Sequence, residues 1–208
     1  MEEHKDYSKD IAEIRSMMER SSKFLSLSGW AGIMAGIYAL LGAYIAKFVF
    51  NFNSYESDFD VVQPGTISPG LLQVIFLAIA ILVLAVGTAV FLSYRKSNRK
   101  HEQLWNSTAK RLIINMAIPL VAGGILILIL ISKGLISLIA PFTLLFYGLA
   151  LYSASKFTYE EVRSLGLIQI GLGLISAYFV EYGLLFWALG FGVFHIIYGI
   201  YMHYKYER

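Results

Sequence analysis

The sequence predicts an all-α, polytopic membrane protein with six transmembrane helices. Hydrophobic residues make up 57% of the chain and charged residues only 15%, whereas a soluble domain usually carries about 25% charged residues. In addition, the 17 basic and 14 acidic residues all lie outside six long apolar runs. A helix needs ~20 predominantly apolar residues to cross the hydrocarbon core of a bilayer. The runs are Phe24–Ala46, Pro69–Tyr94, Leu112–Ser132, Gly134–Ser155, Leu165–Val180 and Tyr182–Tyr204.

All but one of these runs are long enough to span a bilayer as they stand. The exception, Leu165–Val180, reaches spanning length when it is extended back to Val162. The expected spans are therefore 24–46, 69–94, 112–132, 134–155, 162–180 and 182–204. They form one membrane domain, residues 24–208, with no room for a second globular domain.

The segment before the first span, residues 1–23, carries mixed charge. Ile11, Ile14 and Met18 recur at helical spacing within it, which predicts an N-terminal interfacial amphipathic helix on the cytoplasmic face of the membrane. A helix for self-association or for a partner protein is the alternative. Because this charged segment precedes an uninterrupted apolar run, we do not expect a cleavable signal peptide.

The connections between the spans differ greatly in length. Asn51–Ser68 is the longest outer connection, and its two Pro-Gly pairs indicate turns. The outer connections around residues 132–133 and 181–182 are very short, so spans three and four, and spans five and six, are expected to form tight antiparallel hairpins. Similar pairs near the inner ends of even-numbered spans, such as Tyr147-Gly148 and Tyr198-Gly199, favour three hairpins in tandem.

The basic residues are distributed unevenly between the two ends of the expected spans. Of the 17 Lys and Arg residues, only Lys47 and Lys133 fall on one side; the others precede span one, follow span six or lie in the remaining connections. Because Lys and Arg concentrate in cytoplasmic loops, this bias predicts that both termini are cytoplasmic. The basic stretch 95–111 is therefore interpreted as an orientation signal in contact with anionic headgroups, with a docking site for an acidic partner as the alternative.

Two segments resemble a known group of proteins. The stretch Ile14–Ser21, followed by Phe24 and Gly29-Trp30-Ala31-Gly32, resembles the start of uncharacterised bacterial six-span membrane proteins, and Trp187–Val193 with Ile197-Tyr198-Gly199 resembles their end. The resemblance implies the bacterial inner membrane as the location and implies no activity. The hairpin layout is also similar to that of bacterial acid-resistance six-helix membrane proteins, but only in topology, which carries no functional residues.

Small residues form stripes on the first and last spans. Helices in a bilayer associate through close van der Waals contact, which small side chains permit. Gly32, Gly36 and Ala39 lie on one face of the first span, and Gly192 and Gly199 lie on one face of the last. We expect these faces to pack against other helices, either within the chain or in another copy of it.

Three polar side chains near the centre of separate spans are the candidate functional cluster. Asn115, Gln169 and His195 each lie on a small-residue face and in the cytoplasmic half of the expected bundle. Because an unsatisfied polar group in hydrocarbon is costly, we expect them to converge, together with the deep tyrosines Tyr147 and Tyr198. The cluster is interpreted either as interhelical hydrogen bonding or as a polar pocket open to the cytoplasm, where His195 would suit a proton-linked step.

The sequence offers little for enzyme chemistry. The chain has no Cys, and it contains no paired intramembrane carboxylates, no His-Glu-x-x-His and no phosphate-binding glycine loop. No catalytic residues, metal ligands, cofactors or nucleic-acid partners are expected. The function classes that remain are a non-enzymatic binding, sensor or assembly subunit, a small channel or transporter with a cytoplasm-facing cavity, and, least favoured, a membrane enzyme. The expected partner is the lipid bilayer, with a homo-oligomer or a protein partner left open.

Overall fold

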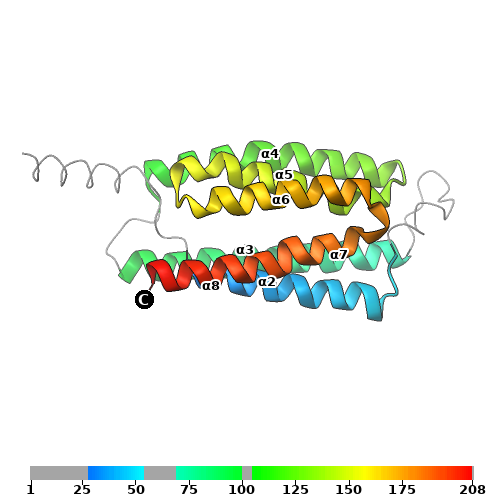
Figure 1. Ribbon diagram of the computed structural model, residues 1–208, viewed down its shortest axis with the longest axis horizontal. Helices are drawn as coiled ribbons and strands as arrows, with labels where there is room; N and C mark the ends of the chain where they lie inside the picture. Colours follow the sequence, from blue (N-terminus) through cyan, green and yellow to red (C-terminus); the bar gives the residue numbers. More distant parts are fainter. Residues whose placement is uncertain (1–27, 54–68, 100–104, 208) are drawn as a thin grey trace, which may run out of the picture.

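The computed structural model describes residues 28–53, 69–99 and 105–207 (Figure 1). Every regular element in these ranges is a helix, which confirms the all-α prediction. The amphipathic helix expected within residues 1–23 and most of the connection 51–68 lie outside these ranges. The main helices are α2 (Gly29–Tyr44), α3 (Pro69–Arg99), α4 (Ser107–Ser132), α5 (Ile139–Ala154), α6 (Glu161–Tyr178), α7 (Gly183–Trp187) and α8 (His195–Tyr206).

Short helical turns extend or link these helices. A π-helical turn, η1 (Ile45–Val49), continues α2, and a second, η6 (Ala188–Phe194), joins α7 to α8 into one continuous helical segment. The 3₁₀ turns are η3 (Ile136–Leu138), η4 (Ser155–Phe157) and η5 (Val180–Tyr182). The last expected span is therefore helical throughout, but its middle third is wound more loosely than an α-helix.

Five of the helical segments are long and apolar enough to cross a membrane: Gly29–Val49, Pro69–Asn98, Ser107–Ser132, Ile136–Phe157 and Val180–Tyr206. They correspond to five of the six expected spans. The sixth, α6, is 18 residues long and begins with charged Glu161. At 1.5 Å per residue its length is about 27 Å, close to the thickness of the hydrocarbon core.

At the end of the bundle where most basic residues lie, α3 and α4 extend beyond the apolar runs. The expected spans ended at Tyr94 and began again at Leu112, but α3 continues to Arg99 and α4 begins at Ser107. The apolar criterion detects the part of a helix inside hydrocarbon and misses polar turns beyond it. Asn106 fixes the start of α4, because its side-chain oxygen accepts a hydrogen bond from the Ala109 N–H at 2.8 Å. Much of the expected basic loop is thus helical.

The hairpin between α4 and α5 has the predicted tight turn. Gly134 has φ of 74°, a left-handed conformation that glycine adopts without steric cost. Its N–H donates to the Ile131 carbonyl at 3.1 Å, and the Leu135 N–H donates to the Leu130 carbonyl at 3.0 Å. These bonds satisfy carbonyls that the end of α4 would otherwise leave unpaired.

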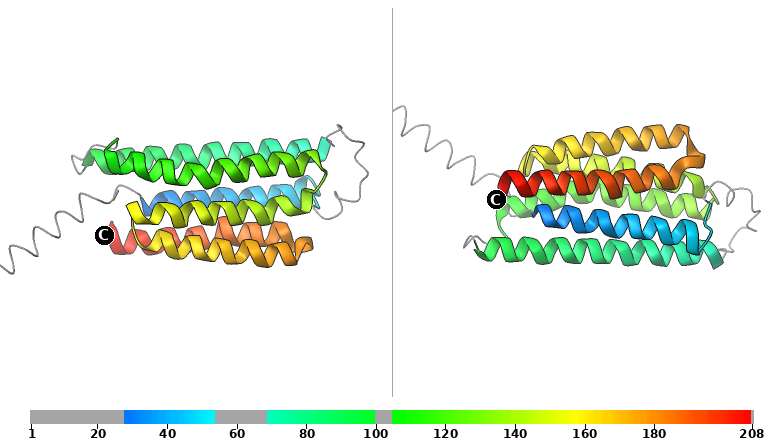
Figure 2. Two further views of the ribbon diagram at one scale, coloured as in Figure 1. Left: turned by 90° about the horizontal axis from the view of Figure 1, so that it is seen from above. Right: turned by 60° about the horizontal axis from the view of Figure 1, so that its bottom comes forward.

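The bundle has two layers of three helices. In Figure 1, α4, α5 and α6 form the upper layer, whereas α2, α3 and the α7–α8 segment form the lower one. Seen from above in the left view of Figure 2, α4 overlies α3, α5 overlies α2 and α6 overlies the α7–α8 segment. Within the layers, α5 packs on α4 and α6, and α2 packs on α3 and α8. The first two expected hairpins, α2 with α3 and α4 with α5, each lie within one layer, whereas the third, α6 with the α7–α8 segment, runs from one layer to the other.

Close glycine contacts hold each layer together. A Cβ atom added at Gly36 of α2 would lie 2.6 Å from the Gly192 carbonyl oxygen, and one at Gly199 would lie 2.6 Å from the Gly29 carbonyl oxygen. In the upper layer, a Cβ atom at Gly148 of α5 would lie 2.7 Å from the Gly166 carbonyl oxygen of α6. The backbones approach so closely that only glycine fits, as expected for helices that associate in lipid.

Candidate functional site

The predicted polar cluster lies where the two layers meet. Tyr147 comes from α5 and Gln169 from α6, both in the upper layer, whereas His195 opens α8 in the lower layer. Gln169 and His195 are buried, with exposed fractions of 0% and 5%. Their backbone positions follow from the glycine contacts described above, which set the faces of α6 and α8 that point between the layers.

A main-chain carbonyl is the centre of the cluster. The Gly190 oxygen accepts a hydrogen bond from Gln169 Nε2 at 2.8 Å, and His195 Nδ1 lies 2.9 Å from the same oxygen. Gly190 belongs to the π-helical turn η6, where the regular i→i−4 pattern is broken. A carbonyl has two lone pairs, so this oxygen can accept from both side chains.

The contacts determine which nitrogen of His195 carries the proton. A carbonyl oxygen can only accept, so Nδ1 must be the donor to Gly190. In a neutral imidazole, Nε2 is then an acceptor, and the Tyr147 hydroxyl, 2.9 Å away, donates to it. Gln169 Nε2 also lies 3.3 Å from His195 Nδ1, but both atoms are donors that point at the same carbonyl.

Gly190 has a steric role as well as a polar one. A Cβ atom there would collide with Leu144 and would lie 2.5 Å from Gln169 Oε1. Any side chain at this position would therefore displace the amide from the carbonyl that it binds. The sequence analysis missed Gly190; the available signal was a pair of glycines, Gly190 and Gly192, within the last span and just before its buried histidine.

Aromatic rings enclose the histidine. The His195 ring stacks on Phe191 at a centroid distance of 5.8 Å and an interplanar angle of 17°, and it lies 5.4 Å from the Tyr147 ring. Phe191 in turn lies 5.0 Å from Tyr147. The imidazole is therefore held by a stacked ring and by hydrogen bonds at both nitrogens, which fixes its orientation.

Two of the predicted cluster residues stand apart from this network. Asn115 lies on α4, and its Nδ2 donates to the Arg111 carbonyl of its own helix at 2.8 Å; α4 packs mainly on α5. Tyr198 lies one turn beyond His195 and packs against the apolar cluster around Leu165 and Met202, but its hydroxyl has no hydrogen-bond partner in the described residues. The structure thus brings together Tyr147, Gln169 and His195 and leaves out Asn115 and Tyr198.

Further buried oxygens without partners in the described residues lie along one face of α6. They are Glu161 Oε2, Gln169 Oε1 and Ser176 Oγ, spaced two helical turns apart. Between Glu161 and Gln169, the side chains of Val162 and Leu165 are buried in the apolar cluster that also contains Met202. Apolar packing therefore separates the first of these oxygens from the others.

The predicted packing residues lie at helix contacts. Gly32 and Gly36 of α2 face Gly192 and Gly199 of the η6–α8 segment, and Ala39 is 2% exposed. This answers the question that the sequence left open, because the partner face of the first span is the last span of the same chain. No group of three possible metal-binding side chains occurs in the described ranges.

At the basic end of the bundle, Glu207 joins three helices, a contact that sequence reasoning missed. Its Oε1 accepts from the Gly29 N–H of α2 at 3.0 Å and from Lys96 of α3 at 3.0 Å, while Oε2 lies 2.9 Å from His203 Nδ1. Burial alone would raise the pKa of Glu207, but these hydrogen bonds outweigh it and lower the pKa below its ordinary value.

A second carboxylate at this end joins the two layers. Glu161 Oε1, at the start of α6, accepts hydrogen bonds from Lys205 and from the Tyr206 hydroxyl, both on α8. Neither acid was singled out from the sequence, because both lie outside the apolar runs.

Comparisons with models of known protein families, with curated proteins and with solved structures found no match to this chain.

Proposed function

We propose that the chain is a six-span membrane protein with both termini on the cytoplasmic side and that it serves as a non-enzymatic binding, sensor or assembly subunit, in keeping with the resemblance to bacterial inner-membrane proteins. Five helical segments already meet the length and hydropathy expected of a membrane span. The sixth span is α6, which lies along α5 in the same layer (Figure 1) and has the length of the hydrocarbon core.

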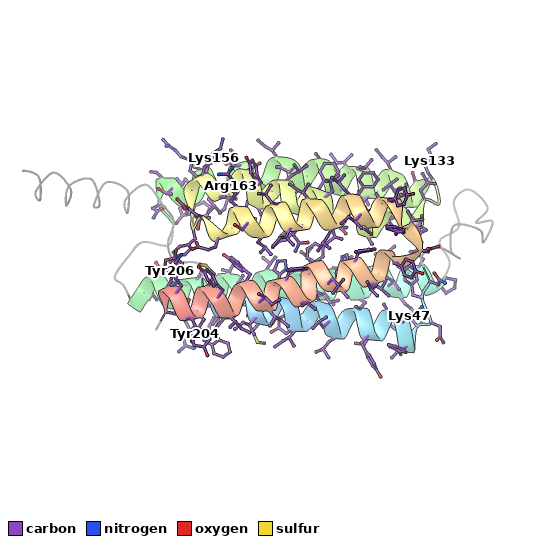
Figure 3. All side chains as sticks on the ribbon, in the orientation of Figure 1. Lys47, Lys133, Lys156, Arg163, Tyr204 and Tyr206 are labelled. Carbon is purple, nitrogen blue, oxygen red and sulfur yellow. The ribbon has the colours of Figure 1, made fainter. Side chains whose placement is uncertain are left out.

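The positions of the charged residues support this orientation. Figure 3 shows Lys156 and Arg163 at the end of the bundle where the chain terminates, and Lys47 and Lys133 at the opposite end. The other basic residues of the described helices, on α3, α4 and α8, belong to the first of these ends. The positive-inside bias assigns that end to the cytoplasm.

The two ends of α4 provide a matched test of topology. The native chain has no Cys, so a single Ser107→Cys or Ser132→Cys variant carries one thiol, at an exposed position in each case. On intact cells an impermeant maleimide is expected to label Ser132→Cys, and to label Ser107→Cys only after permeabilisation. The reverse pattern would invert the topology, and equal labelling of both would contradict a membrane-spanning α4.

The non-enzymatic assignment rests on one observation: the hydrogen-bonding groups of the polar cluster are bonded within the chain. The Tyr147 hydroxyl, both His195 nitrogens and the Gln169 amide nitrogen are engaged with one another or with the Gly190 carbonyl. These bonds connect α5 and α6 to the η6–α8 segment, so they join the two layers. A general acid or base would need a hydrogen-bonding position left for its substrate, and the imidazole keeps none.

We expect His195→Phe and Gln169→Leu to destabilise the fold without changing ion permeability. Each change leaves hydrogen-bonding groups unpaired in the core, at a cost of ~1–3 kcal/mol. The readouts are melting temperature in detergent and proton flux into proteoliposomes, with Tyr38→Phe as the control, because its hydroxyl bonds Thr88 away from the cluster. Proton flux in the wild-type protein that His195→Phe abolishes and Tyr38→Phe preserves would overturn the proposal.

A small channel or transporter is the second candidate, favoured by the row of unpartnered oxygens along α6. Such a row would provide sites for water or for a moving proton, with His195 as the titrating group. The apolar cluster around Leu165 and Met202 lies across its cytoplasmic end, so conduction would require this cluster to open. Replacing Met202 by Gly would then raise proton flux, whereas a packing role predicts only a loss of stability.

A further inference from the structure

The positive charges at the cytoplasmic end differ in how they are compensated. On the lower layer, Lys96 of α3 pairs with Glu207, and Lys205 of α8 pairs with Glu161. Both pairs are between side chains of the chain itself, and Glu207 and Glu161 are only 13% and 15% exposed. These lysines therefore contribute little net charge to the surface.

The basic residues on the upper layer have no such compensation. Lys110 and Arg111 lie in the first turns of α4, Lys156 lies in η4, and Arg163 lies in the first turn of α6. All four side chains are exposed, and none forms an ion pair with an acidic residue among the described residues. We call these four residues the upper basic rim.

The upper basic rim is one surface. The turn η4 packs against α4 and leads directly into α6, so Lys156 lies between the starts of these two helices. Figure 3 shows Lys156 and Arg163 at the same end of the upper layer. Four positive charges are thus gathered around the ends of three neighbouring helices.

Aromatic side chains beside the upper basic rim indicate that it lies at the level of the lipid headgroups. Lys110 Nζ lies 5.9 Å from the centre of the Trp105 ring, and Arg163 Cζ lies 5.4 Å from the Tyr152 ring. Trp105 is 63% exposed. Exposed Trp and Tyr rings concentrate at the level of the lipid headgroups, and each ring holds a cation at that level.

We propose that the upper basic rim binds the headgroups of anionic phospholipids in the cytoplasmic leaflet. This proposal rests on the six-span orientation given above. A lipid fits better than a soluble acidic protein because the same helices expose apolar side chains just beyond the rim, including Ile114 at 60% and Leu167 at 51%. Acyl chains would cover these side chains while the phosphate contacts the cations.

The test compares charge removal at the two ends of the bundle. In the rim variant, Lys110, Arg111 and Lys156 are each replaced by Gln; in the control variant, Lys47 and Lys133 are replaced by Gln at the other end. The full-length proteins are titrated with phosphatidylglycerol in detergent, and bound lipid is counted by native mass spectrometry. Phosphatidylcholine serves as the lipid without net charge.

Each basic residue near a membrane surface contributes about fivefold to the affinity for anionic lipid, so the rim variant is expected to bind phosphatidylglycerol about 100-fold more weakly. The control variant should bind it like the wild-type protein. Because the replaced side chains are exposed and form no ion pair with another described residue, melting temperatures in phosphatidylcholine should be nearly unchanged, which separates lost binding from lost folding.

Three results would overturn the proposal. The first is unchanged binding of phosphatidylglycerol by the rim variant. The second is displacement of the lipid by inorganic phosphate at equal concentration, which would assign the surface to free anions. The third is tighter binding of soluble polyglutamate, which would assign it to an acidic protein. Labelling of Ser107→Cys from the outside, with lipid binding intact, would contradict the orientation and leave the lipid site standing.

Discussion

Replacing Gly36 by Ala tests the closest approach in the lower layer. The added Cβ atom would lie 2.6 Å from the Gly192 carbonyl oxygen and 3.0 Å from the Ile196 backbone nitrogen. Both are main-chain atoms, so a rotamer change cannot relieve the contacts, and α2 must move away from the η6–α8 segment. Overpacking of this kind typically costs ~1–3 kcal/mol.

A second effect of the substitution has the opposite sign. Ala is more favourable than Gly in the interior of a helix by ~1 kcal/mol. Gly171→Ala in α6 provides a control for this term, because a Cβ atom there meets no atom within 4 Å. The difference in free energy of unfolding between the two variants therefore isolates the steric cost, about 2 kcal/mol.

The assay is thermal unfolding of the purified protein in detergent, followed by circular dichroism. For a chain of this length, about 2 kcal/mol corresponds to a difference of roughly 4–8 °C in melting temperature. We expect Gly171→Ala to melt slightly above the wild-type protein and Gly36→Ala to melt below it. If Gly36→Ala melts as high as Gly171→Ala, α2 and α8 do not pack as described and the reasoning fails.

Two further predictions concern other parts of the bundle. Gly123→Ala should lower the melting temperature and Gly124→Ala should raise it, because a Cβ atom at Gly123 would lie 2.5 Å from Phe146 Cβ whereas one at the adjacent position meets nothing within 4 Å; equal shifts would contradict the packing of α4 on α5. Glu207→Gln should lower stability by ~1–2 kcal/mol near neutral pH. The lowered pKa of Glu207 means that its contribution is complete above the ordinary carboxyl pKa of ~4.3 and is lost as the pH falls through the lower value, so the difference in melting temperature from the wild-type protein should shrink below about pH 4. A constant difference would exclude a role for the ionised carboxylate.

The long apolar runs located the helices but not their polar ends. The apolar run that ends at Tyr94 belongs to a helix that continues to Arg99, and the run that begins at Leu112 belongs to one that starts at Ser107. Hydropathy reports the part of a helix that needs hydrocarbon around it, whereas hydrogen bonding and caps decide where the helix stops. Helix α6 differs from these two helices. It is long enough to span a membrane, but the charged residues in its first turn lower its mean hydropathy below that of the other five segments.

Part of the candidate site was predictable, because a polar residue among small residues at helical spacing is expected to face another helix. Gln169 and His195 each lie among glycines at helical spacing, so they had to face other helices, and the structure places them in contact. Asn115 carried the same signature, yet α4 is an outer helix of its layer and its amide bonds its own backbone. A stripe of small residues indicates a packed face but does not identify which helix packs on it.

The sequence by itself determined that the chain is helical, how many apolar runs it has and on which side its positive charge gathers, because these properties depend on residues close together along the chain. Only the tertiary structure decided that the helices form two layers and that the Gly190 carbonyl accepts hydrogen bonds from both Gln169 and His195. It also decided that Glu207 caps α2, 178 residues earlier in the chain. Such contacts join residues that local pattern does not relate, and a main-chain carbonyl exposed by a π-helical turn leaves no mark in hydropathy. The faces that meet are selected by how closely their backbones can approach, which is a property of pairs of helices and not of either helix alone.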